Sequence, residues 1–325
     1  MRLSLNNIKV MLLDSSRELY TRVAIFFNIS RRVAECSNDF HPIIKLDEDT
    51  KEPLPRNIWI YWNDSPPDIV LRCFELVKKL HPNWNIYFLN RKTIADFIDI
   101  DFESINAITH QQQSDAIRLE LLYHYGGIWL DASVIVFHSF DKFKLTIDEK
   151  NVDLLGFYRN VNLIDRNNPV MENWFITARK KSPAIKLWRD EFYKSLSIGI
   201  KTYVDNIRLS NAKALANLYD PYYLVCYVAF QNILPKINSY VMYDCDKNAF
   251  LYHMTGGVRN WLFKRNRWGK YNLIRNVFLN KSNNIYPDMI KLTGKDRDIF
   301  NEYLTGRVFT RDSLASKIIN LLEDN

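Results

Sequence analysis

The chain has 325 residues, of which 47% are hydrophobic, so it can bury a substantial core in one large α/β domain or two small ones. This composition excludes a disordered or fibrous chain. The formal net charge of +7 favours contact with phosphates or anionic lipid. It falls short of the charge density of a dedicated nucleic-acid-binding protein, so we expect no nucleic-acid partner.

The lengths of the apolar runs and the spacing of the cysteines favour a cytoplasmic location. The longest apolar stretch, residues 222–230, is about half of the roughly 18 residues that cross a bilayer. The apolar run at residues 10–13 is too short for a secretory signal. We therefore expect a cytoplasmic protein, with peripheral attachment to the inner face of the membrane left open. The cysteines are far apart and form no C-x-x-C pair, which fits a reducing compartment: Cys36, Cys73, Cys226 and Cys245.

The first half of the chain predicts a parallel α/β unit. Residues 1–52 are expected to form a helical N-terminal extension. The β-branched and aromatic residues 58–62 lie between prolines and predict a strand, and residues 68–80 have the apolar spacing of one helix face. Residues 85–89 predict a second strand. Strand, helix and strand in this order indicate a parallel sheet with a right-handed crossover, which is typical of nucleotide-binding α/β folds.

The next elements place a carboxylate at the end of a core strand. Residues 91–100 predict a short helix, and residues 111–127 predict a longer one with Ser114 as N-cap and Gly126 or Gly127 as C-cap. A buried strand at residues 128–130 then runs into Asp131. Open α/β sheets bind ligands at the carboxyl ends of their strands.

Single residues of segment 114–133 have structural explanations. Asp115 complements a helix dipole, Arg118 pairs with it three residues on, and Asp131 begins a turn. The combination SDAIRLELLYHYGGIWLDAS, however, resembles the central motif of GT-A fold sugar-nucleotide glycosyltransferases. The resemblance is to the capsular polysaccharide synthesis proteins and the family 32 sugar transferases with the DXD motif. The clostridial glucosylating toxins are more distant relatives, and the similarity extends over roughly residues 54–190.

This resemblance implies a GT-A (Rossmann-like) mixed sheet flanked by helices, with a catalytic domain at residues 53–265 and a helical, basic-aromatic C-terminal segment at residues 266–325. It implies transfer of galactose, glucose or an N-acetylhexosamine from a UDP-sugar with retention of configuration. The implied acceptor is a saccharide, for example one linked to undecaprenyl diphosphate, in capsule, O-antigen or other surface polysaccharide synthesis.

The resemblance also assigns the donor site. Trp62, with Tyr61 beside it, lies where the family stacks the uracil ring, whereas we expect Trp59 to be a core aromatic. Asp115 and Arg118 match positions that bind the ribose and sugar hydroxyls of the donor. Asp131 matches the first acid of DXD.

The metal site departs from the family pattern. Ser133 stands where a second Asp would supply a ligand for Mn²⁺ or Mg²⁺, and a hydroxyl is a poorer ligand for a hard cation than a carboxylate. Three alternatives stay open: another residue completes the site formed by Asp131 and Ser133, the metal binds weakly, or a basic side chain neutralises the diphosphate instead.

A candidate for the missing ligand lies at residues 250–261. There His253, Gly256, Arg259 and Trp261 resemble the H-x-x-G-x-x-K-P-W motif of family 8 retaining galactosyltransferases. The resemblance implies that His253 binds the metal, that the backbone at Gly256 approaches the diphosphate and that Arg259 contacts it. Gly257 and Trp261 are counted with the donor-binding residues.

No residue is evident as a nucleophile or base, which fits a front-face mechanism in which the leaving phosphate helps to deprotonate the acceptor. Glu172 and Asn173 match positions that shape the sugar and acceptor face, and with Asp115, Arg118 and Asp131 they are the candidate catalytic residues. A plain helix start at Glu172 is the alternative.

Residues 259–281 hold seven basic residues and no acid, interleaved with aromatics. This pattern suits an anionic membrane surface, and a solvated basic face beside a diphosphate is the alternative. Two further functions stay open: a toxin-like transferase that glycosylates a protein, and a non-catalytic basic binding module on a degenerate transferase fold.

Overall fold

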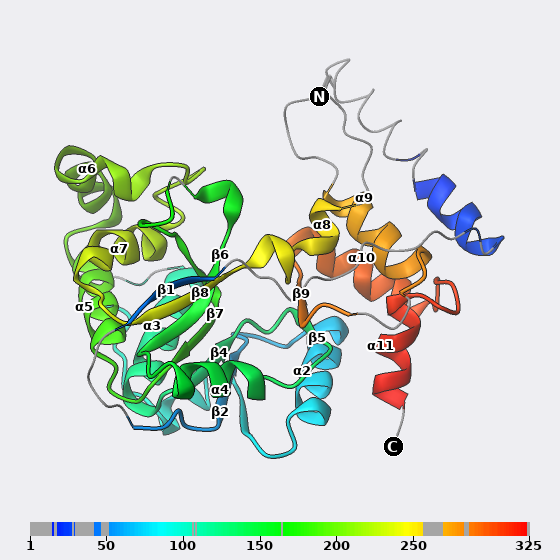
Figure 1. The fold of residues 1–325 in the computed structure, drawn as a ribbon, viewed down its shortest axis with the longest axis horizontal. Helices are drawn as coiled ribbons and strands as arrows, with labels where there is room; N and C mark the ends of the chain where they lie inside the picture. Colours follow the sequence, from blue (N-terminus) through cyan, green and yellow to red (C-terminus); the bar gives the residue numbers. More distant parts are fainter. Residues whose placement is uncertain are drawn as a thin grey trace.

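A computed structural model describes residues 15, 18–27, 29, 42–46, 52–105, 107, 109–163, 165–255, 269–282 and 286–323. Its centre is a seven-stranded mixed sheet with helices on both faces (Figure 1), which confirms the predicted α/β class. In sheet order the strands are β1 (Ile43–Lys45), β8 (Tyr240–Asp244), β6 (Leu154–Tyr158), β7 (Met171–Ala178), β4 (Gly127–Leu130), β2 (Asn57–Tyr61) and β3 (Asn85–Leu89).

The predicted strand–helix–strand unit is confirmed. Strand β2 runs parallel to β3 on one side and to β4 on the other. The helix between β2 and β3, α2 (Asp68–Leu80), buries the apolar face that its spacing predicts. Parallel strands joined in this way direct their carboxyl ends to one edge of the sheet, so Trp62 after β2 and Asp131 after β4 end up at the same edge.

Helices cover the two faces of the sheet with separate apolar cores. One face packs against α3 (His110–Tyr125), α5 (Pro183–Ser197), α6 (Ile200–Ser210) and α7 (Val225–Ile233). The other packs against α2, α4 (Asp141–Glu149), α10 (Gly294–Thr305) and α11 (Leu314–Glu323). Two short helices, α8 (Leu251–Met254) and α9 (Gly269–Ile274), follow β8 in the sequence and precede α10. A π-helical turn, Arg275–Leu279, follows α9 directly.

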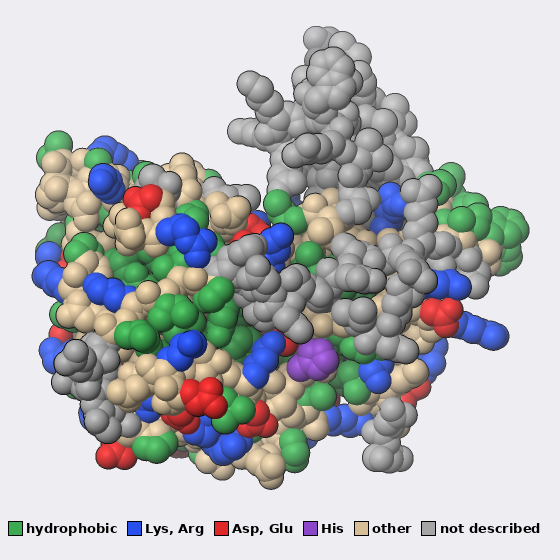
Figure 2. Space-filling view, viewed as in Figure 1, with side chains coloured by type: hydrophobic (Ala, Val, Ile, Leu, Met, Phe, Trp, Pro, Cys, Tyr) green, Lys and Arg blue, Asp and Glu red, His purple; other side chains and the backbone are tan. Residues whose placement is uncertain are grey.

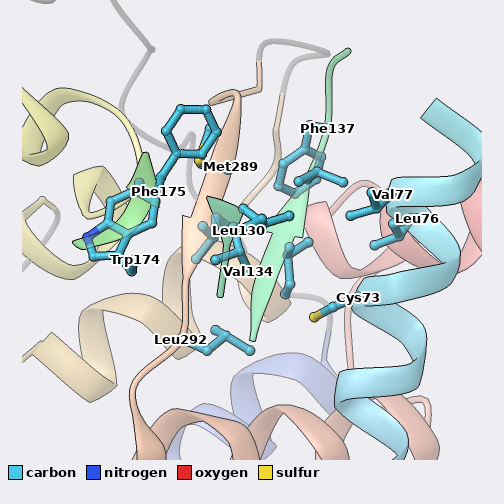
Figure 3. Packing of buried hydrophobic residues seen from close by; sticks show 14 of the residues in the cluster. Cys73, Leu76, Val77, Leu130, Val134, Phe137, Trp174, Phe175, Met289 and Leu292 are labelled. Atoms are coloured by element: carbon cyan, nitrogen blue, oxygen red, sulfur yellow. The ribbon is translucent and has the colours of Figure 1, made fainter. Parts of the chain in front are cut away.

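A second, two-stranded sheet joins the middle of the chain to its C-terminal part. Strand β5 (Val134–Val136) follows Asp131 closely and pairs antiparallel with β9 (Met289–Lys291). Figure 3 shows side chains of this pair, among them Val134 and Met289, between the main sheet and α2. The pair is therefore anchored in the core rather than exposed at the surface.

Two local predictions were wrong, and the structure excludes one alternative, the helix start at Glu172. Helix α3 is capped by Thr109, whose side chain accepts from the backbone of Gln112 in a capping box, so Ser114 lies inside the helix. The short helix expected at residues 91–100 is a single 3₁₀ turn at Ile94–Asp96. Residues 171–178 form a strand, because β6 and β4 pair with it on both sides and override the helix-like start at Glu172.

The domain boundaries at residues 52/53 and 265/266 stay a prediction. In the described part of the chain, β1 adds to the main sheet by pairing with β8, and α11 packs on α2. None of the described helices is long and apolar enough to cross a membrane. The described cysteines, Cys73, Cys226 and Cys245, are buried free thiols.

The turn between α3 and β4 allows a direct test of the fold. Gly127 has φ +102°, and a Cβ there would lie 2.4 Å from the carbonyl oxygen of Asn57, whereas Gly199 has φ +85° and open space around it. We expect Gly127→Ala to lower the free energy of unfolding by roughly 3 kcal/mol or more, because it adds a steric clash to the backbone strain. Gly199→Ala should lower it by only about 1 kcal/mol.

Urea unfolding of both variants followed by circular dichroism measures the difference. Equal losses of stability in the two variants would contradict the close packing of β4 against β2.

Candidate active site

A cavity of about 430 Å³ lies at the carboxyl ends of β2 and β4. Five residues that the sequence singled out line it: Tyr61, Trp62, Arg118, Asp131 and Ser133. They come from separate segments of the chain, and the parallel register of β2 and β4 together with the packing of α3 against β2 and β4 brings them into one place. Two further lining residues, Lys291 and Arg297, come from the C-terminal part of the chain.

Asp131 is the centre of the polar network. Its Oδ1 accepts from Trp129 Nε1 at 3.0 Å and from Arg118 Nη2 at 3.3 Å, and its Oδ2 accepts from Lys291 Nζ at 2.7 Å. Burial alone would raise the pKa of Asp131, but the charges of Lys291 and Arg118 outweigh it and hold the pKa below its usual range. The carboxylate is therefore ionised at neutral pH.

Asp115 lies behind the cavity and does not line it. It is 1% exposed, pairs with Arg118 and accepts a hydrogen bond from Asn173 Nδ2 at 2.9 Å. Burial raises the pKa of Asp115 to about 6, against the opposing charge of Arg118. Arg118 contacts the carboxylates of both Asp115 and Asp131. Asp115 therefore holds the guanidinium of Arg118 in position.

Arg118 is buried and its guanidinium carbon lies 5.0 Å from the ring centroid of Trp129. Contact with Asp115, Asp131 and this indole fixes its position. A guanidinium held in this way presents a directional fork of donors to an anionic ligand in the cavity.

Glu172 and Asn173 lie next to this network on β7, and neither lines the cavity. Glu172 is 6% exposed, and its Oε2 accepts from Trp174 Nε1 at 3.1 Å and from the Tyr227 hydroxyl at 3.2 Å. Burial raises the pKa of Glu172 to about 7, although Arg159 nearby lowers it. Glu172 is therefore a buried group that can hold a proton close to neutral pH.

Three aromatic residues lie on β2 or directly after it: Trp59, Tyr61 and Trp62. Trp59 is 1% exposed and donates to the carbonyl oxygen of Gly126 at 2.8 Å, which confirms it as a core residue. Trp62 is half-buried, lines the cavity and has the guanidinium carbon of Arg297 5.1 Å from its ring centroid. Tyr61 is buried and donates to Asn63 Oδ1 at 3.0 Å.

The described residues do not fit a site for a divalent cation. Ser133 lines the cavity but its hydroxyl donates to the carbonyl oxygen of Leu292 at 3.2 Å. Both carboxylate oxygens of Asp131 already accept from cationic side chains. Within the part of the chain that the structure describes, no group of three or more His, Cys, Asp or Glu side chains could hold a metal ion. The Mn²⁺ or Mg²⁺ ion stays a prediction.

His253 does not line the cavity. It lies on α8, 8% exposed, with Nε2 3.4 Å from Oδ2 of Asp296, the carboxylate of the capping box of α10. His253 therefore contacts the start of α10, the helix that carries Arg297 into the cavity. The other residues of the predicted motif, Gly256, Gly257, Arg259 and Trp261, lie outside the described residues.

Lys291 and Arg297 were not singled out from the sequence. Lys291 ends a strand of only three residues, too short to be recognised by its alternation, and Arg297 lies in a segment where only a helix was expected. The capping pattern of Thr293 and Asp296 is the one local signal that marks this turn.

A model of the capsular polysaccharide synthesis protein family matches residues 8–198, more than half of the chain. The chain belongs to this family. The match confirms the coarser part of the predicted resemblance, while the likeness to family 32 and the C-terminal family 8 motif stay predictions.

Two curated fungal proteins are similar to the chain. The O-glycosyltransferase braB of Annulohypoxylon truncatum is 29% identical over 167 residues, 45% of this chain and 39% of that protein. The glycosyltransferase afumC of Aspergillus fumigatus is 30% identical over 157 residues, 42% of this chain and 39% of that protein. The chain spans about two fifths of the length of these relatives.

Among solved structures, the PaToxG glycosyltransferase has a TM-score of 0.32 at 14% identity, covering 70% of this chain and 88% of that one. The galactosyltransferase LgtC in complex with donor and acceptor sugar analogues has the same TM-score and identity, covering 67% of this chain and 95% of that one.

The buried carboxyl of Glu172 predicts a pH dependence of stability. Because its pKa is raised from 4.5 to about 7, the folded state keeps a proton that the unfolded state releases in this range. Its contribution is fully present below about pH 4.5 and is lost as pH rises to about 7. Relative to Glu172→Gln, the native protein should lose about 2 to 3 kcal/mol of unfolding free energy between pH 5 and pH 8.

Urea unfolding at several pH values measures this difference. Glu75→Gln, at an exposed carboxylate on α2, is the matched control and should follow the native pH profile. An unchanged profile for Glu172→Gln would show that Glu172 titrates normally.

Proposed function

We propose that the chain is a glycosyltransferase that moves a hexose from a UDP-sugar to a hydroxyl of a saccharide acceptor in surface polysaccharide synthesis. The observation that carries the proposal is the ionised Asp131 at the carboxyl end of β4, in one cavity with Arg118 and Trp62. Membership of the capsular polysaccharide synthesis family and the names of the two curated relatives support it.

The cavity offers a group for each part of such a donor. The half-buried indole of Trp62 suits stacking of a uracil ring. Arg118, Lys291 and Arg297 supply the positive charge that a diphosphate needs. A volume of about 430 Å³ lies within the range of small-molecule sites.

The reaction we infer proceeds with retention on one face of the sugar. The bond from the anomeric carbon to the diphosphate oxygen breaks, the acceptor oxygen forms the new bond on the same face, and its proton passes to the leaving phosphate. The positive side chains of Arg118, Lys291 and Arg297 stabilise the charge that develops on that phosphate. This stabilisation is the main contribution of the site to catalysis. Asp131 is held by Lys291 and Arg118 and is a poor nucleophile in that state, so it orients rather than attacks.

The acceptor we propose is a lipid-linked saccharide, such as one on undecaprenyl diphosphate, reached by peripheral attachment to an anionic membrane. The helical segment at residues 18–26 exposes apolar side chains over two turns: Leu19, Tyr20, Val23, Phe26 and, just beyond it, Phe27. Figure 2 shows hydrophobic side chains gathered at this edge of the molecule, where Figure 1 has the first helix in blue. An ion pair from Arg22 to Glu302 ties this helix to α10.

The donor site is tested by titration of UDP and UDP-hexoses followed by calorimetry. We expect micromolar binding of UDP, and a loss of about 1 to 3 kcal/mol in Trp62→Ala, because stacking on an aromatic ring contributes about that much per base. Trp62→Phe keeps a stacking surface and should retain most of the affinity. Equal binding by the native protein and Trp62→Ala would remove Trp62 from the site, and absence of nucleotide binding would overturn the proposed function.

The membrane surface is tested by sedimentation with vesicles of phosphatidylcholine, with and without phosphatidylglycerol. Phe26→Glu combined with Phe27→Glu should weaken binding to anionic vesicles at least tenfold, since each buried aromatic contributes about 1.5 to 3 kcal/mol. Leu209→Glu changes a side chain on α6 that is 88% exposed, and it should leave binding unchanged. Binding that is equally weakened by Leu209→Glu would contradict a specific face.

A further inference from the structure

We propose that Lys291 holds the position beside Asp131 that the sequence assigns to a divalent cation, and that the site binds the donor diphosphate through Lys291, Arg297 and Arg118 without a metal ion. This inference rests on the proposed function and specifies how the same site handles negative charge.

The backbone fixes Lys291 at this position. Strand β9 pairs antiparallel with β5, with Lys291 opposite Val134, and the N–H of the next residue, Leu292, donates to the carbonyl oxygen of Ser133 at 3.0 Å. On its other side the N–H of Lys291 donates to the carbonyl oxygen of Ala249 at 3.0 Å. Its side chain is only 14% exposed, and Nζ lies 2.7 Å from Asp131 Oδ2. The contact is thus built by the sheet register and does not depend on a mobile surface side chain.

The oxygens near Asp131 are unsuited to a divalent cation. Mg²⁺ takes six oxygen ligands, usually from one or two carboxylates together with phosphates and waters, and Ca²⁺ takes six to eight. Here Asp131 shares both oxygens with cationic donors, and the hydroxyl of Ser133 is directed to Leu292. The ammonium of Lys291 already lies 2.7 Å from Asp131 Oδ2. A divalent cation bound to Asp131 would therefore be close to this positive charge, and like charges repel strongly in a partly buried site.

Charge and geometry favour an anionic ligand instead. Among the residues that line the cavity, Arg118, Lys291 and Arg297 carry three positive charges against two carboxylates, Asp64 and Asp131. Asp115, which does not line the cavity, pairs with Arg118. An ammonium group has three donors, so Lys291 can bind Asp131 and still donate to phosphate oxygens. At the start of α10, the N–H of Thr293 donates to Asp296 Oδ2 within the capping box. Arg297, the next residue of the helix, lines the cavity and can donate to the ligand.

Calorimetric titration of UDP into the full chain, in EDTA and in excess Mn²⁺, tests the inference. The native protein should bind UDP with the same affinity in both solutions. Lys291→Ala should lose at least tenfold of its UDP affinity in EDTA and regain part of it in Mn²⁺, because the variant frees an Asp131 oxygen for the metal. Its affinity for uridine, which has no phosphate, should not change.

Two variants control for charge and folding. Lys291→Arg keeps a cation at this position and should retain metal-independent binding. Lys144→Ala removes a lysine of similar burial on α4, paired with Asp148 and outside the cavity, and should bind UDP like the native protein. Thermal unfolding confirms that each variant is folded.

The two proposals fail in different ways. Binding of UDP that requires Mn²⁺ and is indifferent to Lys291→Ala would overturn this inference and leave the proposed function in place. No binding of UDP or any UDP-hexose by the native protein, in EDTA or in Mn²⁺, would overturn the proposed function itself.

Discussion

The site depends on the contact of one buried guanidinium, that of Arg118, with the carboxylates of Asp115 and Asp131. Removing either partner of such a cluster leaves an unpaired charge in a region of low dielectric, which costs several kcal/mol. Asn173 on β7 and the indole of Trp129 complete the shell around it. Strand β7, helix α3 and strand β4 must therefore come together in one register for the cluster to exist, so the fold and the polar site stabilise each other.

The pairing of β5 with β9 has a comparable role on the other side of Asp131. It connects a segment 160 residues further along the chain to the end of β4 and thereby places Lys291 beside the carboxylate. Apolar residues of this pair lie between α2 and the main sheet, so the charge of Lys291 is held by a core contact. The structure thus lowers the pKa of Asp131 by packing elements that are remote in sequence.

Neighbouring carboxyls experience opposite effects in this arrangement. Asp131 faces two cations and is stabilised in its ionised form, whereas burial dominates at Asp115 and Glu172 and raises the pKa of both. Asp115 and Asp131, which share Arg118, and Glu172 on the neighbouring strand β7 therefore differ in their readiness to hold a proton. Such separation follows from the balance between desolvation and opposing charge at each position rather than from residue type.

The sequence by itself determined the strand–helix–strand unit, the glycine turn before β4 and the place of Asp131 at the end of a core strand, because local periodicity and turn chemistry fix these elements. The assignment of Tyr61 and Trp62 to the same site came from the family resemblance. It did not determine the helix cap at Thr109 or the strand at β7, where a capping box and pairing on both sides prevailed over weaker local signals. Only the tertiary structure decided that Lys291 stands next to Asp131, since that contact depends on long-range pairing of three-residue strands, and such pairing leaves no periodic pattern in the chain.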